Sequence, residues 1–360
     1  MFPYWLLFSI FAVGSLEYRR RGNIGSQTSL LFLAAAAFVA LMIGFRYEVG
    51  GDWGSYQRMF TETRYLALGP SLGRGDPGYM FLNWLGQRLD LNIWFVNFIC
   101  ALIFTWGLIK FARRQPSPWL AGLVAVPYLI IVVAMGYTRQ AAAIGFILAA
   151  LASLDRSEIT LTSLMRLAFY VFGAVIFHKS AIIVLPLVAV AGSKNRFVTA
   201  GIVVALAAIL YYLLVESAVD KLLSGYVDAG YESQGALVRS AMSLPPALLY
   251  LRFHKEFRLT PVQRKLWRNF AFAAIATFGL LMVSTSSAAI DRLALYLIPL
   301  QMFVLSRLPE AFGNGERPNG QVVLGVIAYS AIIQFTWLNY AQNSGFWIPY
   351  KLFPLGTQFF

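Results

Sequence analysis

Residues 119–154 read WLAGLVAVPYLIIVVAMGYTRQAAAIGFILAALASL, two apolar runs separated by the polar cluster GYTRQ at 136–140. We predict that each run is a membrane segment and that the cluster is the turn between them. A charge close to the hydrocarbon of a bilayer is costly and usually marks a site. Arg139, inside this turn, is therefore a candidate functional residue.

The same alternation extends along all 360 residues, which have a mean hydropathy of +0.65, 59% hydrophobic residues and 12% charged residues. Soluble domains contain about 25% charged residues. We therefore predict an all-α polytopic integral membrane protein, a single transmembrane domain over residues 1–360 with about 12 membrane segments. The predicted segments are 2–16, 29–45, 92–110, 119–135, 140–154, 165–177, 180–192, 197–215, 237–251, 269–284, 289–306 and 320–337.

Composition also excludes several classes of protein. The first apolar run lacks a preceding basic region and a following cleavage site, so we expect a retained helix and no signal peptide. Cys100 is the one cysteine, which excludes an intrachain disulfide and a thiolate metal cluster. The net charge of +13 indicates cytoplasmic anchoring in a membrane protein, and no nucleic acid partner is expected.

Basic residues assign sides to the connecting segments. One set of alternate connections holds 18 of the 29 Lys and Arg residues, including the basic loop 252–268, and the other set holds 11. Because cytoplasmic loops carry the excess of Lys and Arg, the first set is predicted to be cytoplasmic. Both termini are then external, together with the loops 46–91 and 216–236 and the tail 338–360.

The stretch 165–192 decides whether this sidedness holds. As a single span it would put the basic loop 252–268 outside. Two segments of about 13 residues, meeting at His178, keep that loop inside, although each is about 20 Å long and too short for a core of about 30 Å. We therefore predict a hairpin whose tip ends inside the membrane, below a cavity open to the outside.

Four polar clusters then lie on the external side: RYEVGGD (46–52), GYTRQ (136–140), FHKS (177–180) and DRLALY (291–296). The first has Gly50-Gly51, which permits unusual backbone geometry and would aim Asp52 at the membrane mouth as a general base. The alternative is a turn in which Asp52 pairs with Arg46.

In GYTRQ, Thr138 is a plausible helix N-cap and Arg139 lies in the first helical turn. A helix N-terminus does not favour a cation, so we expect an anion beside Arg139, either a bound diphosphate or one of the carboxylates of Glu48, Asp52 and Asp76.

FHKS offers His178 as a base or phosphate donor and Lys179 as an attractor of anions; a hydrogen-bonded structural role is the alternative for His178. DRLALY places Asp291 and Arg292 at the start of a helix, with Tyr296 one turn below Arg292. The catalytic candidates are Asp52, Arg139, His178 and Arg292. The candidates for substrate binding are Arg46, Glu48, Tyr56, Asp76, Tyr79, Tyr137, Gln140, Lys179, Arg239 and Tyr296.

The sequence lacks several catalytic motifs: GxGxxG, a Walker loop, HExxH, a paired metal-binding carboxylate motif and a nucleophile elbow. Several Arg residues with one Asp and one His suit a lipid-linked phosphate better than a metal ion. We expect neither a metal nor another cofactor.

In order along the chain, the segments GFRYEVGGDWGSYQRMF, DPGYMFLNWLGQRL, GYTRQAAAIGFILAALASL, VIFHKSAIIVLPL and DRLALYLIPLQ resemble the EpsG family of bacterial exopolysaccharide biosynthesis proteins, a branch of the Wzy-type polymerases. The resemblance covers most of residues 30–305. The family often has Thr where this chain has Gly51, and the tail from Asn339 matches nothing in it.

The resemblance implies a glycosyltransferase of GT-C-like architecture in the bacterial inner membrane, with a periplasm-facing cavity. Such a polymerase transfers a growing glycan from undecaprenyl diphosphate to the sugar of another lipid-linked repeat unit, without metal and with inversion. Tyr56, Tyr79 and nearby Trp residues would stack on sugars. Membrane lipids, a chain-length regulator and export proteins are the further partners it suggests.

Three other functions share these features. A flippase or transporter for the same lipid-linked glycan would need access from both faces, whereas the clusters lie on one. An O-antigen-type ligase attacks the same kind of sugar diphosphate and is not separated by these residues. A membrane O-acyltransferase would use a catalytic His. The choice between Asp52 and His178 as base stays open.

Overall fold

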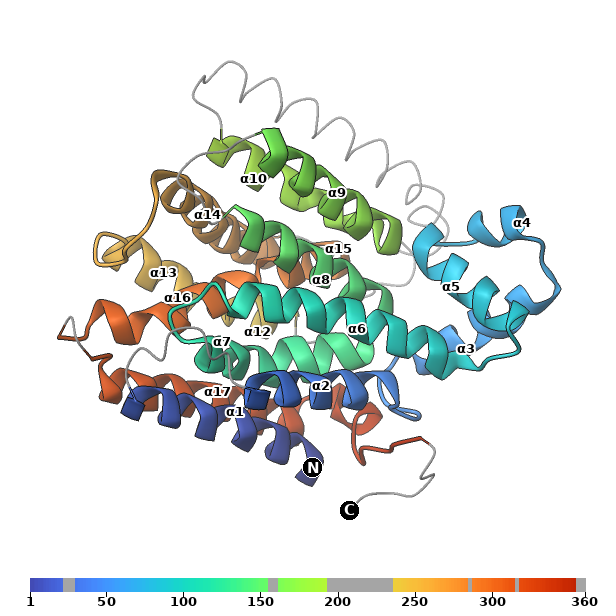
Figure 1. Ribbon diagram of the computed structural model, residues 1–360, viewed down its shortest axis with the longest axis horizontal. Helices are drawn as coiled ribbons and strands as arrows, with labels where there is room; N and C mark the ends of the chain where they lie inside the picture. The colour runs from blue at the N-terminus through green and yellow to red at the C-terminus, as the bar shows by residue number, and fades with distance from the viewer. Residues whose placement is uncertain (22–29, 155–160, 193–235, 284–286, 315–316, 354–360) are drawn as a thin grey trace.

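The computed structural model describes residues 1–21, 30–154, 161–192, 236–283, 287–314 and 317–353, and these form an all-α bundle (Figure 1). Within the described residues, three helices are long and apolar enough to cross a membrane: α6 (Ile93–Ala112), α14 (Pro261–Val283) and α17 (Gly320–Tyr340). Shorter apolar helices accompany them, among them α1 (Phe2–Arg21) and α2 (Leu30–Gly44). This set of helices indicates a multi-pass membrane protein.

Residues 119–154 form the centre of the bundle. The helices of this stretch are α7 (Pro118–Ala125), the π-helical segment η2 (Val126–Ala134) and α8 (Thr138–Ser153), and every residue from Leu120 to Ala134 is buried. Glycines let α6 and α8 approach closely, since a Cβ on Gly107 would lie 1.8 Å from the Gly145 carbonyl oxygen. Small residues at such contacts are the usual means by which membrane helices associate.

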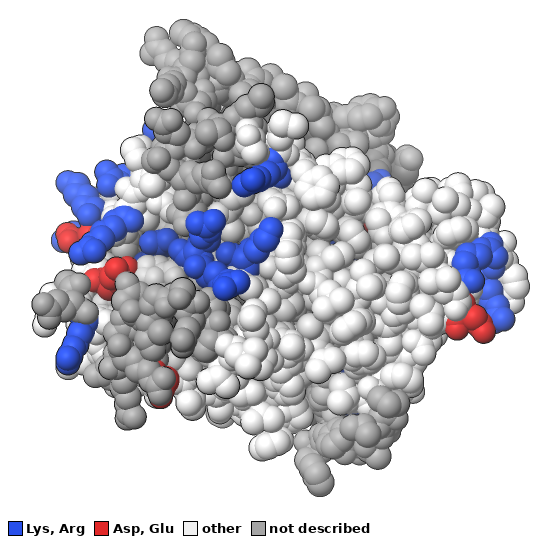
Figure 2. All heavy atoms as spheres, viewed as in Figure 1, with Lys and Arg blue, Asp and Glu red and all other residues white. Residues whose placement is uncertain are grey.

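The two ends of the bundle differ. The segment between α2 and α6 forms α3 (Trp53–Glu62), η1 (Thr63–Tyr65), α4 (Leu68–Leu72) and α5 (Pro77–Arg88), which project at one end (Figure 1). Lys and Arg side chains are most numerous at the other end, and a smaller group lies beside acidic side chains at the end with α3–α5 (Figure 2). At the end with more Lys and Arg, the loops after α6 and after α13 (Leu244–Phe253) meet the last turns of α16 (Pro299–Ala311), since Arg114, Arg258 and Arg307 line adjoining small pockets. Which end of the molecule faces the cytoplasm stays a prediction.

Two predicted segments are wrong as single helices. Residues 237–251 divide into α12 (Ala236–Ala241) and α13 (Leu244–Phe253), and residues 289–306 divide into α15 (Ser287–Ala294), η4 (Leu295–Leu297) and α16 (Pro299–Ala311). Prolines explain both divisions, because α13 and α16 each begin with proline in the first turn, where its missing N–H is tolerated.

Helix α14 begins inside the predicted basic loop 252–268, at Pro261. Thr260 and Gln263 cap it reciprocally: the Thr260 N–H donates to Gln263 Oε1 at 2.9 Å, and the Gln263 N–H donates to Thr260 Oγ1 at 3.2 Å. This capping box is visible in the sequence as Thr-Pro-Val-Gln and moves the helix start eight residues before the predicted 269.

The predicted break at His178 is confirmed. Helix α9 (Leu161–Phe177) ends there, His178 is extended with φ −158° and ψ 114°, and η3 (Lys179–Ile183) leads into α10 (Val184–Gly192). After the break the packing partner changes: α9 packs on α8, whereas α10 packs on α14. The depth of this tip in a bilayer stays a prediction.

The tail after α17 folds back on the bundle. It forms η5 (Gln342–Phe346), then Trp347 buries its indole and donates from Nε1 to the Ile131 carbonyl at 2.8 Å. A bridge pairs Leu352 with Arg46, and Tyr4 on α1 donates to the Trp347 carbonyl at 2.6 Å. The predicted segment 197–215, nearly all of the loop 216–236 and the last seven residues lie outside the described residues.

Candidate functional site

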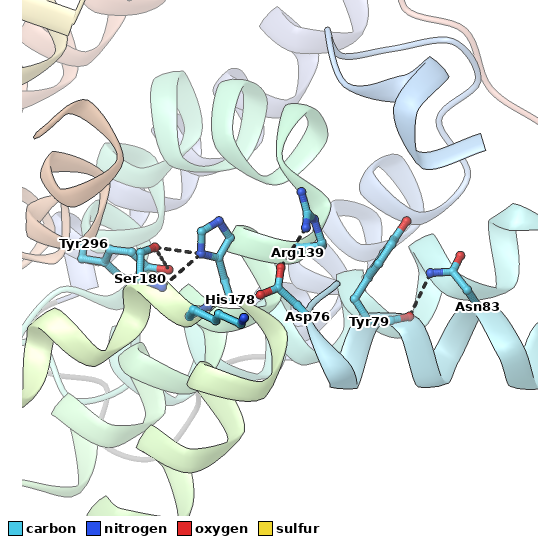
Figure 3. Close-up of polar contacts among 8 residues, drawn as sticks. Asp76, Tyr79, Asn83, Arg139, His178, Ser180 and Tyr296 are labelled. Carbon is cyan, nitrogen blue, oxygen red and sulfur yellow. Dashed lines mark hydrogen bonds and ion pairs between the residues drawn. The ribbon is translucent and has the colours of Figure 1, made fainter. Parts of the chain in front are cut away.

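Residues of three polar clusters, Arg139 of GYTRQ, His178 and Ser180 of FHKS and Tyr296 of DRLALY, lie together with Asp76 (Figure 3). Gln140 of GYTRQ donates from Nε2 to the Arg292 carbonyl of DRLALY at 3.0 Å. Ser180 of FHKS joins Tyr296 by a hydrogen bond of 3.2 Å. RYEVGGD packs closely against the start of GYTRQ. A Cβ on Gly50, whose φ is +101°, would lie 2.6 Å from the Met135 carbonyl oxygen, so this approach requires glycine. Gln140 and Arg292, which are 152 residues apart in the sequence, thus belong to one site.

The centre of the site is an ion pair between Arg139 and Asp76. Arg139 Nη1 lies 2.8 Å from Asp76 Oδ2, and the Lys179 backbone N–H donates to Asp76 Oδ1 at 3.3 Å. Burial raises the pKa of Asp76, while Arg139 and the Lys179 N–H favour its ionised form. Asp76 is therefore the carboxylate that pairs with Arg139, and it also links the start of α5 to the break between α9 and η3.

Arg139 still has hydrogen-bonding capacity for a ligand. Its Nε is buried and has no partner among the described residues. Its guanidinium lies 5.9 Å from the ring of Tyr56, and its side chain is 27% exposed. An anion arriving at this guanidinium would add to the Asp76 contact.

Asp52 is a half-buried carboxylate at the N-cap position of α3 that makes no side-chain capping bond. Nothing in the described part of the chain forms a hydrogen bond or ion pair with its side chain. Burial raises the pKa of Asp52, and the nearby Arg139 and Arg292 oppose that rise. A carboxylate with these properties can accept a proton from a bound hydroxyl.

His178 is held by the residue two positions after it. The Ser180 backbone N–H donates to His178 Nδ1 at 3.3 Å, and Ser180 Oγ lies 2.7 Å from the same nitrogen (Figure 3). Because a backbone N–H can only donate, Nδ1 is an acceptor and the neutral ring carries its proton on Nε2. His178 is thus arranged to donate a hydrogen bond from Nε2. Ser180 was not among the predicted site residues, although it completes the FHKS cluster.

Arg292 is an exposed cation of the site. Its carbonyl accepts from Gln140, but its guanidinium has no hydrogen bond or ion pair with any residue that the structure describes. Arg292 and Arg139 both interact electrostatically with Asp52 and His178. The neighbouring Asp291 instead pairs with Arg239, whose Nε and Nη2 lie 2.6 and 2.5 Å from its carboxylate oxygens. Since α15 begins at Ser287, Asp291 and Arg292 do not start a helix as predicted.

Arg46 lies outside this cluster. It is 1% exposed, and its guanidinium donates to the carbonyls of Ile43 at 2.6 Å and Val49 at 3.2 Å and to Thr138 Oγ1 at 2.6 Å. Thr138 therefore does not cap α8 as predicted; its hydroxyl accepts from Arg46. Glu48 also points elsewhere and pairs with Lys351 of the tail at 2.7 Å.

Aromatic candidates surround the centre. Tyr56 and Tyr79 are 3% and 0% exposed and contact each other at 5.4 Å, so their rings pack inside the protein. Tyr296 is fully buried, whereas Tyr137 is partly exposed and Lys179 is exposed. Among the described residues, no three His, Cys, Asp or Glu side chains lie together in a way that could hold a metal ion.

The chain was also compared with known proteins. The model of the EpsG family matches residues 29–352, which include every element of the site. No curated protein and no solved structure matches. The ordered clusters and their convergence on one site agree with this match, and the chain belongs to the EpsG family, which is implicated in exopolysaccharide biosynthesis.

Proposed function

We propose that this protein is a membrane glycosyltransferase that polymerises lipid-linked repeat units at the periplasmic face of the bacterial inner membrane. The observation that carries the proposal is an unpaired carboxylate, Asp52, beside two guanidinium groups, Arg139 and Arg292, of which Arg292 is exposed. Charges of this kind suit a sugar linked to a diphosphate, because the leaving group is anionic and the nucleophile is a neutral hydroxyl.

Each residue has a part in the transfer. Arg139 and Arg292 bind the donor diphosphate, and His178 donates from Nε2 to one of its oxygens. The acceptor hydroxyl attacks the anomeric carbon, its proton passes to Asp52, and the bond from that carbon to the diphosphate oxygen breaks. The electron pair leaves with undecaprenyl diphosphate. Attack from the face opposite to the leaving group inverts the anomeric carbon.

The position of the site supports the proposed sidedness. The cluster lies towards the end of the bundle that carries α3 and α5, and the basic connections gather at the other end (Figures 1 and 2). Since Lys and Arg concentrate on the cytoplasmic side, the site is assigned to the periplasmic side. The Tyr4 hydrogen bond to the Trp347 carbonyl brings the start of α1 next to the described part of the tail.

The test is a reaction with purified full-length protein and one lipid-linked repeat unit, with no other component. A ladder of glycans of increasing length, absent with Arg292→Ala, supports a polymerase. Transfer of one unit to a different acceptor, with no ladder, indicates a ligase. Movement of the intact lipid-linked unit across vesicles, with no new glycosidic bond, indicates a flippase.

A further inference from the structure

A second cationic site lies at the far end of α8. Arg139 and Ser153 stand at opposite ends of this helix, about 20 Å apart at 1.5 Å per residue. Beside Ser153 is a cavity of about 240 Å³ between α6, α8 and α9. Its lining consists of Lys110, Arg114, Ala149, Ala152, Ser153, Arg166 and Tyr170. The reaction proposed above uses none of these residues.

The lining is selective for anions. Among the described residues, its lining contains three cations and no carboxylate. Lys110 is fixed in place: its Nζ lies 4.2 Å from the ring centroid of Trp106 and 5.2 Å from that of Tyr170, and it donates to the Tyr170 hydroxyl at 3.1 Å. A lysine that only anchored the protein on its cytoplasmic side would extend its ammonium into water. This ammonium is instead held between two rings at the cavity wall.

The size of the cavity limits what enters it. Pockets for drug-sized ligands have volumes of about 300–1,000 Å³, so a space of this size suits a phosphate head group and excludes an oligosaccharide. The room exists because α8 presents small side chains, Ala149, Ala152 and Ser153, on this face. Ser153 and Tyr170 add hydroxyl groups that can bind phosphate oxygens.

An apolar surface continues from the cavity along α9. Met165, Phe169 and Phe172 are 66%, 65% and 66% exposed, and their spacing of four and three residues places them on one side of the helix. They neighbour Arg166 and Tyr170 in sequence. We infer that this cavity binds the phosphate of an anionic membrane lipid, whose acyl chains lie along α9. The site is on the side opposite to the proposed reaction.

The test measures binding of phosphatidylglycerol to purified full-length protein in detergent, by native mass spectrometry. Replacing Lys110, Arg114 and Arg166 together with Gln is expected to weaken binding about tenfold or more, because each removed cation weakens attraction to an anionic lipid. The matched control replaces Lys255, Arg258 and Arg264, one exposed Lys and two exposed Arg at the same end, with Gln. This control is expected to bind within about twofold of the wild type.

A second variant tests the cavity without changing charge. Ala152→Phe fills the cavity and is expected to weaken lipid binding as strongly as the triple Gln variant. Arg166→Gln changes one exposed residue of the lining without altering the packing. Phosphatidylcholine and inorganic phosphate are titrated in parallel. Binding of inorganic phosphate that depends on the same residues, with no preference for phosphatidylglycerol, would assign the site to free phosphate and overturn the lipid proposal. So would equal losses in the pocket and control triples, or wild-type binding by both the pocket triple and Ala152→Phe.

Discussion

Asp76 and Arg139 form a 2.8 Å ion pair that links the start of α5 to the first turn of α8. The same carboxylate accepts the Lys179 backbone N–H, next to the break between α9 and η3. One side chain therefore orients a proposed phosphate-binding arginine and fixes the hairpin tip that carries His178. The Asp76 carboxylate offsets the unfavourable position of the Arg139 cation at a helix N-terminus.

We expect Asp76→Ala to abolish polymer formation and to lower the free energy of unfolding by about 1–3 kcal/mol, because it leaves a partly buried guanidinium and a backbone N–H without their acceptor. Asp76→Asn keeps an acceptor for Lys179 and should destabilise less. The matched control is Glu62→Gln, which removes the exposed pair with Arg74 and should cost below about 1 kcal/mol. Denaturant titration of the purified variants and a glycan ladder measure both effects. A fully active Asp76→Ala protein contradicts the proposed orientation of Arg139.

Arg292 and Arg46 should respond in opposite ways. Arg292→Ala changes an exposed side chain, so the free energy of unfolding should stay within about 0.5 kcal/mol of the wild type while polymer formation is lost. Arg46→Ala removes the donor to Ile43, Val49 and Thr138 and should lower stability and expression. Thermal unfolding of both variants, beside in vitro activity, separates them. Equal destabilisation by the two changes would contradict the assignment of Arg292 to ligand binding.

Asp52 should give the pH–activity profile an acid limb, a fall in activity at low pH. A base works when ionised, so activity should fall as the pH drops through a pKa that burial raises above the ordinary value of 3.8. Asp52→Asn should lose activity and this limb together. The same shift has the opposite sign for stability: the folded state holds the Asp52 proton more tightly than the unfolded state, so the contribution of Asp52 to stability falls as pH rises through this window. Unfolding midpoints of wild type and Asp52→Asn, compared between about pH 4 and pH 7, should therefore show no stability loss in the variant at the higher pH.

His178 should respond according to which ring nitrogen is replaced. In His178→Asn the amide oxygen can take the place of Nδ1 and accept the Ser180 N–H, but the Nε2 donor is lost. We expect near-normal stability and activity reduced about 10- to 100-fold, with activity falling as steeply at low pH as in the wild type. His178→Gln should keep a donor near Nε2 and lose the cap. Loss of the acid limb in His178→Asn would identify His178, and not Asp52, as the base.

The tail should be essential to the fold although it has no catalytic candidate. Trp347→Ala removes an indole that is 2% exposed and donates to Ile131, so we expect a loss of about 3–5 kcal/mol in the free energy of unfolding. Lys351→Ala, which breaks an exposed pair with Glu48, is the neighbouring control and should have little effect. Limited proteolysis of the tail before and after the change reports whether it has detached. A stable Trp347→Ala protein contradicts the packing of this segment.

The sequence by itself determined the membrane class, the run of apolar helices and the four polar clusters, because hydropathy is a local property that a window of residues reveals. It also determined the helix break at His178, since the basic loop 252–268 could stay on the cytoplasmic side only if the chain reversed there. Proline and cap residues in the sequence also indicate the helix divisions at Pro245 and Pro299 and the early start of α14. These features were not predicted.

Only the tertiary structure decided which charged residue has which partner. Arg46 and Arg292 both stand in polar clusters at the ends of apolar runs, yet one is buried against carbonyls and Thr138 and the other is exposed. Asp76, the carboxylate that pairs with Arg139, is 63 residues away in the sequence, and Trp347 of the tail is 343 residues from Tyr4. Hydrogen bonds and ion pairs depend on distances that packing sets between remote segments, and no local pattern of residues contains those distances.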